Sequence, residues 1–154
     1  MAKRSMIFIV MFCLSALALG YAADANEGTW KLNEKKSKIA AGAAKNTTVT
    51  YTAAGDSYKC VTEGTDGSGQ PLHTEWTGKF DGKDYPVTGD SSANTRSMKK
   101  VDARHYKLVN KKDGKEFLTG AVEISPDGKT RMLTTQWKDA SGKEKSSTAV
   151  YDKQ

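Results

Sequence analysis

The sequence contains little of what disulfides and metal sites require. It has two cysteines, and only Cys60 lies outside the apolar N-terminal segment, so the rest of the chain cannot form an internal disulfide. It also has two histidines. His73 stands two residues before Glu75 on one strand face, but no third ligand follows at a spacing typical of metal sites. We therefore expect no metal ion, and we expect Cys60 to pack as a small hydrophobe.

Patterns typical of nucleophilic catalysis are also missing. No Gly-x-Ser-x-Gly elbow occurs, and the carboxylates lie mainly among turn residues, so no acid and base pair stands out. No glycine-rich stretch precedes a helix that could hold a phosphate group. The sequence therefore predicts no catalytic residue and no cofactor, and it favours a protein that is not an enzyme.

Long apolar runs are absent except at the N-terminus. Lys3 and Arg4 precede the run MIFIVMFCLSALALG, and small residues follow it in YAADAN. This order is typical of a secretory signal peptide, and the run is shorter than the roughly 20 residues that a retained membrane anchor needs. We expect a signal peptide over residues 1–22, with cleavage after Ala22 preferred to cleavage after Ala25.

Export follows from this signal peptide. Bulky Phe12 precedes Cys13, where a lipoprotein signal has a small residue, so we expect no lipid anchor. We predict a secreted or periplasmic protein that has no stable membrane insertion once the signal is removed.

The charge is positive but evenly spread. The formal net charge of +6 falls by two when Lys3 and Arg4 leave with the signal. Lysines lie beside Asp and Glu along the chain without a sustained basic block, which indicates solvated faces and no nucleic-acid partner. Residues 23–154 are enough for one domain with one core, which we expect to be a monomer.

Turn chemistry divides the domain into short segments rich in Thr, Val and Tyr. Asp-Gly pairs between alternating segments favour hairpins, because glycine accepts the positive φ of a two-residue turn. The pattern predicts an all-β antiparallel meander, with NEKKSKIAAGAAKN as a short helix or a loop. The predicted strands are 28–33, 46–53, 56–64, 71–80, 94–101, 104–111, 116–125, 129–138 and 144–152.

Alternation along the strands indicates which face points inward. In LHTEWTGKF, the side chains of Leu72, Trp76 and Phe80 fall on one face, while the charged side chains fall on the other. The same alternation turns aromatic side chains inward on several strands, where they form the core or line a pocket for a partly apolar molecule. The pocket candidates are Tyr51, Tyr58, Trp76, Phe80, Tyr106 and Trp137.

Consecutive antiparallel strands with one apolar face form a sandwich or close into a barrel. Closure removes the exposed strand edges, and we expect an up-and-down barrel of about eight to ten strands. The interior of so small a barrel is either filled by side chains or wide enough for one small ligand.

The stretch Gly28-Thr29-Trp30 opens the first predicted strand, and hairpins follow to the end of the sequence. In this respect the chain resembles the lipocalin and fatty-acid-binding-protein group of calycin-type barrels. The resemblance implies that Gly28 lets the first strand bend and that Trp30 packs across the closed end of the barrel. It also implies a basic side chain over the tryptophan, for which Arg131 and Lys153 are candidates.

A closer resemblance is to small exported bacterial lipocalin-like proteins, in the stretches GTDGSGQPLHTEW, FDGKDYPVTG, SPDGKT and VYDK. The chain departs from the lipocalin pattern because it has no second signature of the Thr-Asp-Tyr kind, no disulfide pair and no C-terminal helix. The resemblance therefore supports the fold more than it identifies a ligand.

Three functions are compatible with these features. The leading hypothesis is an exported lipocalin-like barrel that binds a small amphipathic or apolar molecule without catalysis. The second is a filled barrel that acts as an inhibitor or interaction module through loops such as 64–71 and 86–95. The third is an envelope enzyme with titratable groups that converge in a wet cavity.

Overall fold

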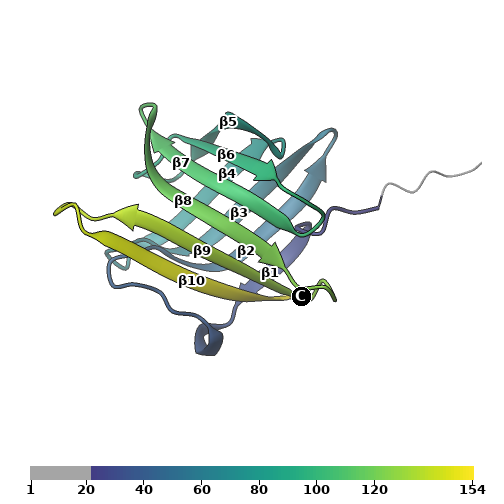
Figure 1. Cartoon of the computed structure of the whole chain (residues 1–154), viewed down its shortest axis with the longest axis horizontal. Helices are drawn as coiled ribbons and strands as arrows, with labels where there is room; N and C mark the ends of the chain where they lie inside the picture. Colours follow the sequence, from purple (N-terminus) through teal and green to yellow (C-terminus); the bar gives the residue numbers. More distant parts are fainter. Residues whose placement is uncertain (1–21) are drawn as a thin grey trace, which may run out of the picture.

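Ten antiparallel strands close into one barrel in the computed structural model, which describes residues 22–154 (Figure 1). Each strand pairs with its neighbours in the sequence, and the last strand returns to pair with the first. The strands are β1 (Gly28–Leu32), β2 (Lys45–Ala54), β3 (Ser57–Thr65), β4 (Pro71–Gly78), β5 (Asp81–Thr88), β6 (Thr95–Lys100), β7 (His105–Lys112), β8 (Lys115–Ile124), β9 (Thr130–Lys138) and β10 (Glu144–Lys153). The predicted all-β, lipocalin-like barrel is confirmed. The predicted signal peptide, 1–22, lies outside the described residues except for its last one.

The connections between strands alternate between the two ends of the barrel. We call one end the closed end; it comprises residues 24–27, 55–56, 79–80, 101–104 and 125–129. We call the other the open end; it comprises residues 33–44, 66–70, 89–94, 113–114 and 139–143. Because the meander is regular, the position of a residue along its strand places it near one end or the other.

The β7–β8 hairpin shows why Asp-Gly pairs predict the turns. Asp113 has a φ of 50° and Gly114 a φ of 79°, the two positive values that a type I′ turn requires. Asn94 in a neighbouring loop fastens this turn. Its Nδ2 donates to Asp113 Oδ1 at 2.8 Å, and its Oδ1 accepts from the Asp113 amide at 3.0 Å.

The structure corrects the sequence prediction in one strand and defines one connection. β5 lies between the predicted strands 71–80 and 94–101, where no strand was predicted, because Asp81-Gly82 and Pro86 are typical turn residues. β5 tolerates Pro86 because it pairs with β4 at only two positions. The segment expected to be a short helix or a loop contains one 3-10 turn, η1 (Glu34–Lys36), within a loop. In the described part of the chain, no helix combines the length and the apolar character of a membrane span.

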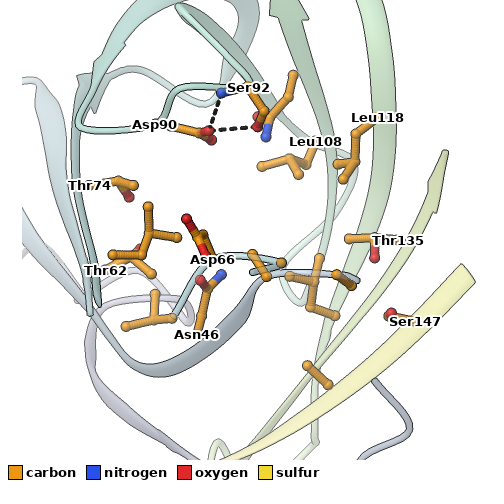
Figure 2. A pocket seen from close by; sticks show the side chains of 18 of the residues that line it. Asn46, Thr62, Asp66, Thr74, Asp90, Ser92, Leu108, Leu118, Thr135 and Ser147 are labelled. Atoms are coloured by element: carbon orange, nitrogen blue, oxygen red, sulfur yellow. Dashed lines mark hydrogen bonds between the residues drawn. The ribbon is translucent and has the colours of Figure 1, made fainter. Parts of the chain in front are cut away.

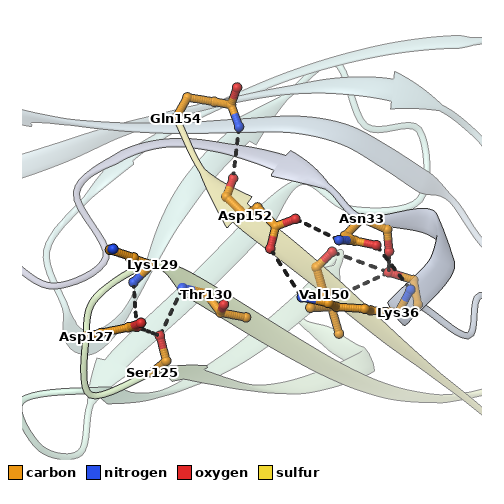
Figure 3. A network of polar contacts seen from close by, with 10 residues as sticks. Asn33, Lys36, Ser125, Asp127, Lys129, Thr130, Val150, Asp152 and Gln154 are labelled. Atoms are coloured by element: carbon orange, nitrogen blue, oxygen red, sulfur yellow. Dashed lines mark hydrogen bonds and ion pairs between the residues drawn. The ribbon is translucent and has the colours of Figure 1, made fainter.

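Side chains fasten the seam where β10 meets β1. Asn33 Nδ2 donates to Asp152 Oδ2 at 2.7 Å, and the Lys36 ammonium lies 3.8 Å from Asp152 Oδ1 (Figure 3). The Ser37 hydroxyl donates to the Asn33 carbonyl at 2.7 Å and accepts from the Val150 amide at 2.9 Å. These contacts hold the loop after β1 against β10 and help to close the barrel.

Aromatic side chains fill the part of the barrel next to the closed end. Phe80 stacks on Tyr58 with ring centres 4.4 Å apart and meets Tyr106 edge to face at 5.2 Å. Trp76 lies parallel to Phe80 at 6.3 Å. We call Tyr58, Trp76, Phe80 and Tyr106 the aromatic cluster. Aromatic pairs in these geometries stabilise the fold beyond their burial, by about 0.5–1.5 kcal/mol each.

Candidate ligand-binding cavity

A cavity of about 410 Å³ extends into the barrel from its open end (Figure 2). Residues of β2–β4 and β6–β10 line it, and loop residues 42–44, 66–68 and 90–92 lie at its mouth. Small-molecule sites in proteins have volumes of about 300–1,000 Å³, so this cavity suits a ligand at the small end of that range. The barrel interior is therefore not completely filled by side chains.

One side of the cavity, on β7, β8 and β9, carries a group of large apolar side chains beside the polar side chains of Asn110 and Thr135. Leu108, Leu118 and Leu133 come from these three neighbouring strands, and Trp137 pairs with Leu118 across the β8–β9 ladder. Gly120 leaves room for the wall, because a Cβ atom there would lie 3.1 Å from Leu108 Cδ2 and 3.3 Å from Leu133 Cδ1. This surface can take up the apolar part of a small molecule.

The wall across the cavity carries hydroxyl groups. Thr62 on β3 and Thr74 on β4 are buried cross-strand partners, and Figure 2 shows both across the cavity from Leu118. Cys60 lies beside them, with its Sγ 3.8 Å from Thr62 Oγ1. Because a hydroxyl group both donates and accepts hydrogen bonds, this wall can bind the polar part of a ligand.

Tyr51, Arg131 and Tyr151 line the part of the cavity nearest the closed end. Arg131 is 2% exposed, and its guanidinium carbon lies 5.7 Å from the ring centre of Tyr51 and 5.4 Å from that of Tyr151. Arg131 Nε donates to Asn26 Oδ1 at 2.9 Å. Burial raises the pKa of the Tyr51 hydroxyl, although the charges of Arg131 and Arg96 oppose the shift. Burial also raises the pKa of Tyr151, so both phenols are neutral near neutral pH.

Arg96 is a second cation on the cavity lining. Its Nε donates to Asn110 Oδ1 at 2.8 Å, which fixes one edge of the guanidinium. Within residues 22–154, neither Arg96 nor Arg131 has a carboxylate oxygen within 4.0 Å. The cavity therefore holds two arginine side chains without an ion-pair partner from this part of the chain.

The carboxylates of Asp66 and Asp90 fix the loops at the mouth. Asp66 Oδ1 accepts from the Ser68 amide at 2.9 Å and from its hydroxyl at 2.7 Å. Asp90 Oδ1 accepts from the Ser92 amide at 2.8 Å and from its hydroxyl at 2.6 Å (Figure 2). The hydrogen bond from Ser68 lowers the pKa of the Asp66 carboxyl. Each carboxylate therefore stabilises its own loop. These two loops belong to the segments 64–71 and 86–95, which the sequence suggested as contact loops for a protein partner.

The six predicted pocket residues divide into two groups. Tyr51 and Trp137 line the cavity. The other four form the aromatic cluster, which lies closer to the closed end and outside the cavity lining. Alternation identifies the face of a strand but not the height along the barrel axis, and it could not separate these groups.

Sequence reasoning assigned Arg131 only as a possible cover for Trp30 and missed its place in the cavity. The signal was present, because Arg131 has the same strand parity as Trp137, which was predicted to point inward. Lys153 covers the tryptophan instead, with its ammonium 5.0 Å from the centre of the indole ring. Trp30 is fully buried at the closed end, and its Nε1 donates to the Asn26 carbonyl at 2.9 Å.

His73 lies on the outer surface, as its strand parity predicted. Its Nδ1 lies 2.5 Å from Glu63 Oε1, and its Nε2 lies 3.4 Å from Glu75 Oε1. The hydrogen bonds to Glu63 and Glu75 raise the pKa of His73. Among residues 22–154, no three His, Cys, Asp or Glu side chains are grouped so that they could hold a metal ion. The expected absence of a metal and of a cofactor stays a prediction.

Comparisons with known proteins add little to this geometry. No protein-family model and no curated protein matches the chain. Among solved structures, a similar chain is that of EF1p2_mFAP2b bound to DFHBI. The two chains share 11% sequence identity and superpose with a TM-score of 0.47, over 84% of this chain and 94% of that chain. The assignment of the cavity rests on the side chains of this barrel.

Proposed function

We propose that this protein binds one small amphipathic molecule inside its barrel without catalysing a reaction. The observation that carries the proposal is the cavity of about 410 Å³, which has leucine side chains on one side and two buried threonine hydroxyls across from them. An apolar group of the ligand lies against Leu108 and Leu133, and a polar group reaches Thr62 and Thr74. The modest volume favours a compact ligand over a long fatty acid.

In this proposal, the six aromatic side chains have two different roles. Tyr51 and Trp137 contact the ligand, because both line the cavity. The aromatic cluster supports the cavity from the closed end and keeps its shape. Trp76, a pocket candidate from the sequence, therefore supports the cavity and does not contact the ligand. Its replacement should lower the stability of the fold more than it lowers the ligand affinity.

The proposal also includes the cell compartment and the oligomeric state. The features that support export are Lys3 and Arg4, the apolar run and the small residues after it, which together are typical of a signal peptide. The mature protein is then secreted or periplasmic, as in the small exported bacterial proteins that it resembles. It acts as a monomer that takes a small molecule and no nucleic acid.

Filling the cavity with a side chain tests the proposal. Ala149 is buried on the cavity lining, so Ala149→Phe places a ring where the ligand lies. Thr52→Phe adds the same ring to an exposed position on β2 and is the matched control. The neutral dye N-phenyl-1-naphthylamine should gain fluorescence with the wild-type protein and with Thr52→Phe. With Ala149→Phe, it should not. Equal dye uptake by Ala149→Phe and the wild type contradicts the proposal.

A second candidate function uses the loops at the open end. The observation in its favour is that Asp66 and Asp90 hold both loops in defined conformations, which preorganises them for a protein partner. Copurification of a partner that is lost when residues 66–70 are replaced by a Gly-Ser linker would favour this function over ligand binding.

The third hypothesis, an envelope enzyme, has weaker support. The cavity groups whose pKa is raised are the phenols of Tyr51 and Tyr151, and burial moves both away from the neutral range in which a general acid or base works best. The protein is proposed to be a binding protein for that reason.

A further inference from the structure

Arg131 is a buried charged residue on the cavity lining, and its surroundings indicate the chemical class of the ligand. It lines the cavity, is 2% exposed, and lies over the rings of both Tyr51 and Tyr151. The two rings attract the cation through their π faces but offer no negative charge. Burial of an ionised group is costly unless the group is paired and hydrogen-bonded.

The hydrogen bonds of this guanidinium are incomplete. Nε donates to Asn26 Oδ1, but Arg131 Nη1 has no acceptor among residues 22–154 although it is buried. Asn26 Nδ2, on the residue bonded to Arg131, is likewise a buried donor without an acceptor in that part of the chain. Buried polar groups are nearly always paired, and Asn26 is fully buried outside the cavity lining, so the unpaired donor that bears on the cavity belongs to Arg131.

Among residues 22–154, the groups around Arg131 do not supply the negative charge that would balance its guanidinium. Burial raises the pKa of Tyr51 and Tyr151, so neither phenol supplies a phenolate near neutral pH. Arg96 adds a second positive charge to the same lining. Asp66 and Asp90 are at the mouth, where each carboxylate accepts hydrogen bonds within its own loop.

We propose that the ligand is an organic anion whose carboxylate or similar acidic group binds the guanidinium of Arg131, while its apolar part lies along the wall on β7, β8 and β9. This inference rests on the proposed function and specifies the ligand class. A planar guanidinium recognises a carboxylate through two parallel charge-assisted hydrogen bonds, which a neutral amide cannot reproduce. Arg96 adds to the selection of an anion over a neutral or cationic molecule.

A matched pair of probes tests the charge of the ligand. 2-Naphthoate and 2-naphthamide have the same apolar ring system, which is compact enough for this cavity, and they differ in charge at one group. Isothermal titration calorimetry of both with the wild-type protein at pH 7.5 should show that the carboxylate binds at least about tenfold more tightly than the amide. Equal affinities would overturn the inference and leave cavity binding itself intact.

Variants of Arg131 and of its partner identify the group responsible. Arg131→Met should bring the two affinities within about threefold, whereas Arg131→Lys should retain part of the preference. Lys107→Met removes a positive charge from the outer face of β7 and should leave the preference unchanged. An undiminished preference in Arg131→Met would overturn the assignment to Arg131.

Asn26→Asp tests the same point if Arg131→Met does not fold. This change keeps the shape of the side chain and places a carboxylate beside Arg131 Nε, where it neutralises the guanidinium from within the barrel. The preference for 2-naphthoate should fall toward that of the amide while the fold remains. Retention of the full preference would overturn the inference. If neither probe binds the wild type, and N-phenyl-1-naphthylamine is excluded as well, both this inference and the proposed function fail.

Discussion

The Lys153 ammonium lies 5.0 Å from the centre of the Trp30 ring, and the Lys153 side chain passes over Gly28. A Cβ atom on Gly28 would lie 2.7 Å from Lys153 Cε, and Gly28 has a φ of 121°, a conformation that other residues rarely adopt. The first and last strands therefore meet at the closed end in a contact that combines a glycine, an indole and a cation.

Replacement of Lys153 tests this contact. Lys153→Met should lower the free energy of unfolding by about 0.5–2 kcal/mol, because it removes the cation from the face of Trp30 while it keeps an unbranched apolar side chain. Urea denaturation followed by tryptophan fluorescence measures the effect. Lys153→Arg, which keeps the charge, should lie closer to the wild type, and equal losses in both variants would contradict a role for the cation.

Gly78 tests the packing of the aromatic cluster. A Cβ atom there would lie 2.5 Å from Trp76 Cζ2 and 2.6 Å from Tyr85 Cγ. Gly78→Ala should lower the free energy of unfolding by about 1–3 kcal/mol because the buried ring of Trp76 and the half-buried ring of Tyr85 must shift. Gly120→Ala is the milder comparison, since its nearest neighbour is a leucine methyl group at 3.1 Å. A smaller loss for Gly78→Ala than for Gly120→Ala would contradict the described packing.

Trp137 should report ligand binding by fluorescence. It lines the cavity, whereas Trp30 and Trp76 are buried outside the cavity lining. A ligand that binds the wild type should change the tryptophan emission, and Trp137→Phe should abolish most of this change while calorimetry still detects binding. Trp76→Phe should keep the response. A response that depends on Trp76 instead would place the ligand in the aromatic cluster.

His73 should titrate above its ordinary pKa of 6.5, because Glu63 and Glu75 accept hydrogen bonds from the charged ring. Since the folded pKa is the higher one, the interaction stabilises the protein fully below the unfolded pKa. The stabilisation is lost as the pH rises through the folded pKa. Proton NMR titration should show a lower His73 pKa in Glu63→Gln. Glu116→Gln on β8 should leave it unchanged, and a His73 pKa that does not respond to Glu63 would contradict the prediction.

Signal cleavage after Ala22 should preserve a contact at the closed end. Asp24 is buried, and its carboxylate lies 2.5 Å from both the Lys100 ammonium and the Tyr106 hydroxyl. N-terminal sequencing of the protein from its own host should therefore find a chain that begins at Ala23. A recombinant chain that begins at Asn26 should lose about 1.5–3 kcal/mol of stability, because it lacks these charge-assisted hydrogen bonds. A mature chain that begins at Asn26 would contradict this prediction.

The sequence predicted the fold well where one physical rule acted alone. On β4, the alternation of Leu72, Thr74 and Trp76 with charged residues correctly identified the inner face, because burial on one side of a sheet imposes a period of two. β5 was missed because Asp81-Gly82 and Pro86 indicate a turn, and the limited pairing of β5 with β4 lets a strand form there. No local rule could show that limited pairing.

The cavity was less accessible to sequence reasoning. The sequence identified the inward aromatic residues as one set. Four of them pack next to the closed end, and Tyr51 and Trp137 line the cavity. Arg131 was considered only as a candidate cover for Trp30, the role that the resemblance implies, so its place in the cavity was not predicted. Its burial depends on Asn26, which precedes β1 and is more than 100 positions away in the chain.

Native mass spectrometry of the mature protein, purified from its own host, tests the central proposal most directly. The proposal predicts a protein that carries one small molecule at one-to-one stoichiometry. Denaturation should release that molecule, and its mass and ionisation should identify an amphipathic compound with an acidic group. A protein that carries no small molecule, and that takes up neither N-phenyl-1-naphthylamine nor 2-naphthoate, would contradict a ligand-binding function for this barrel.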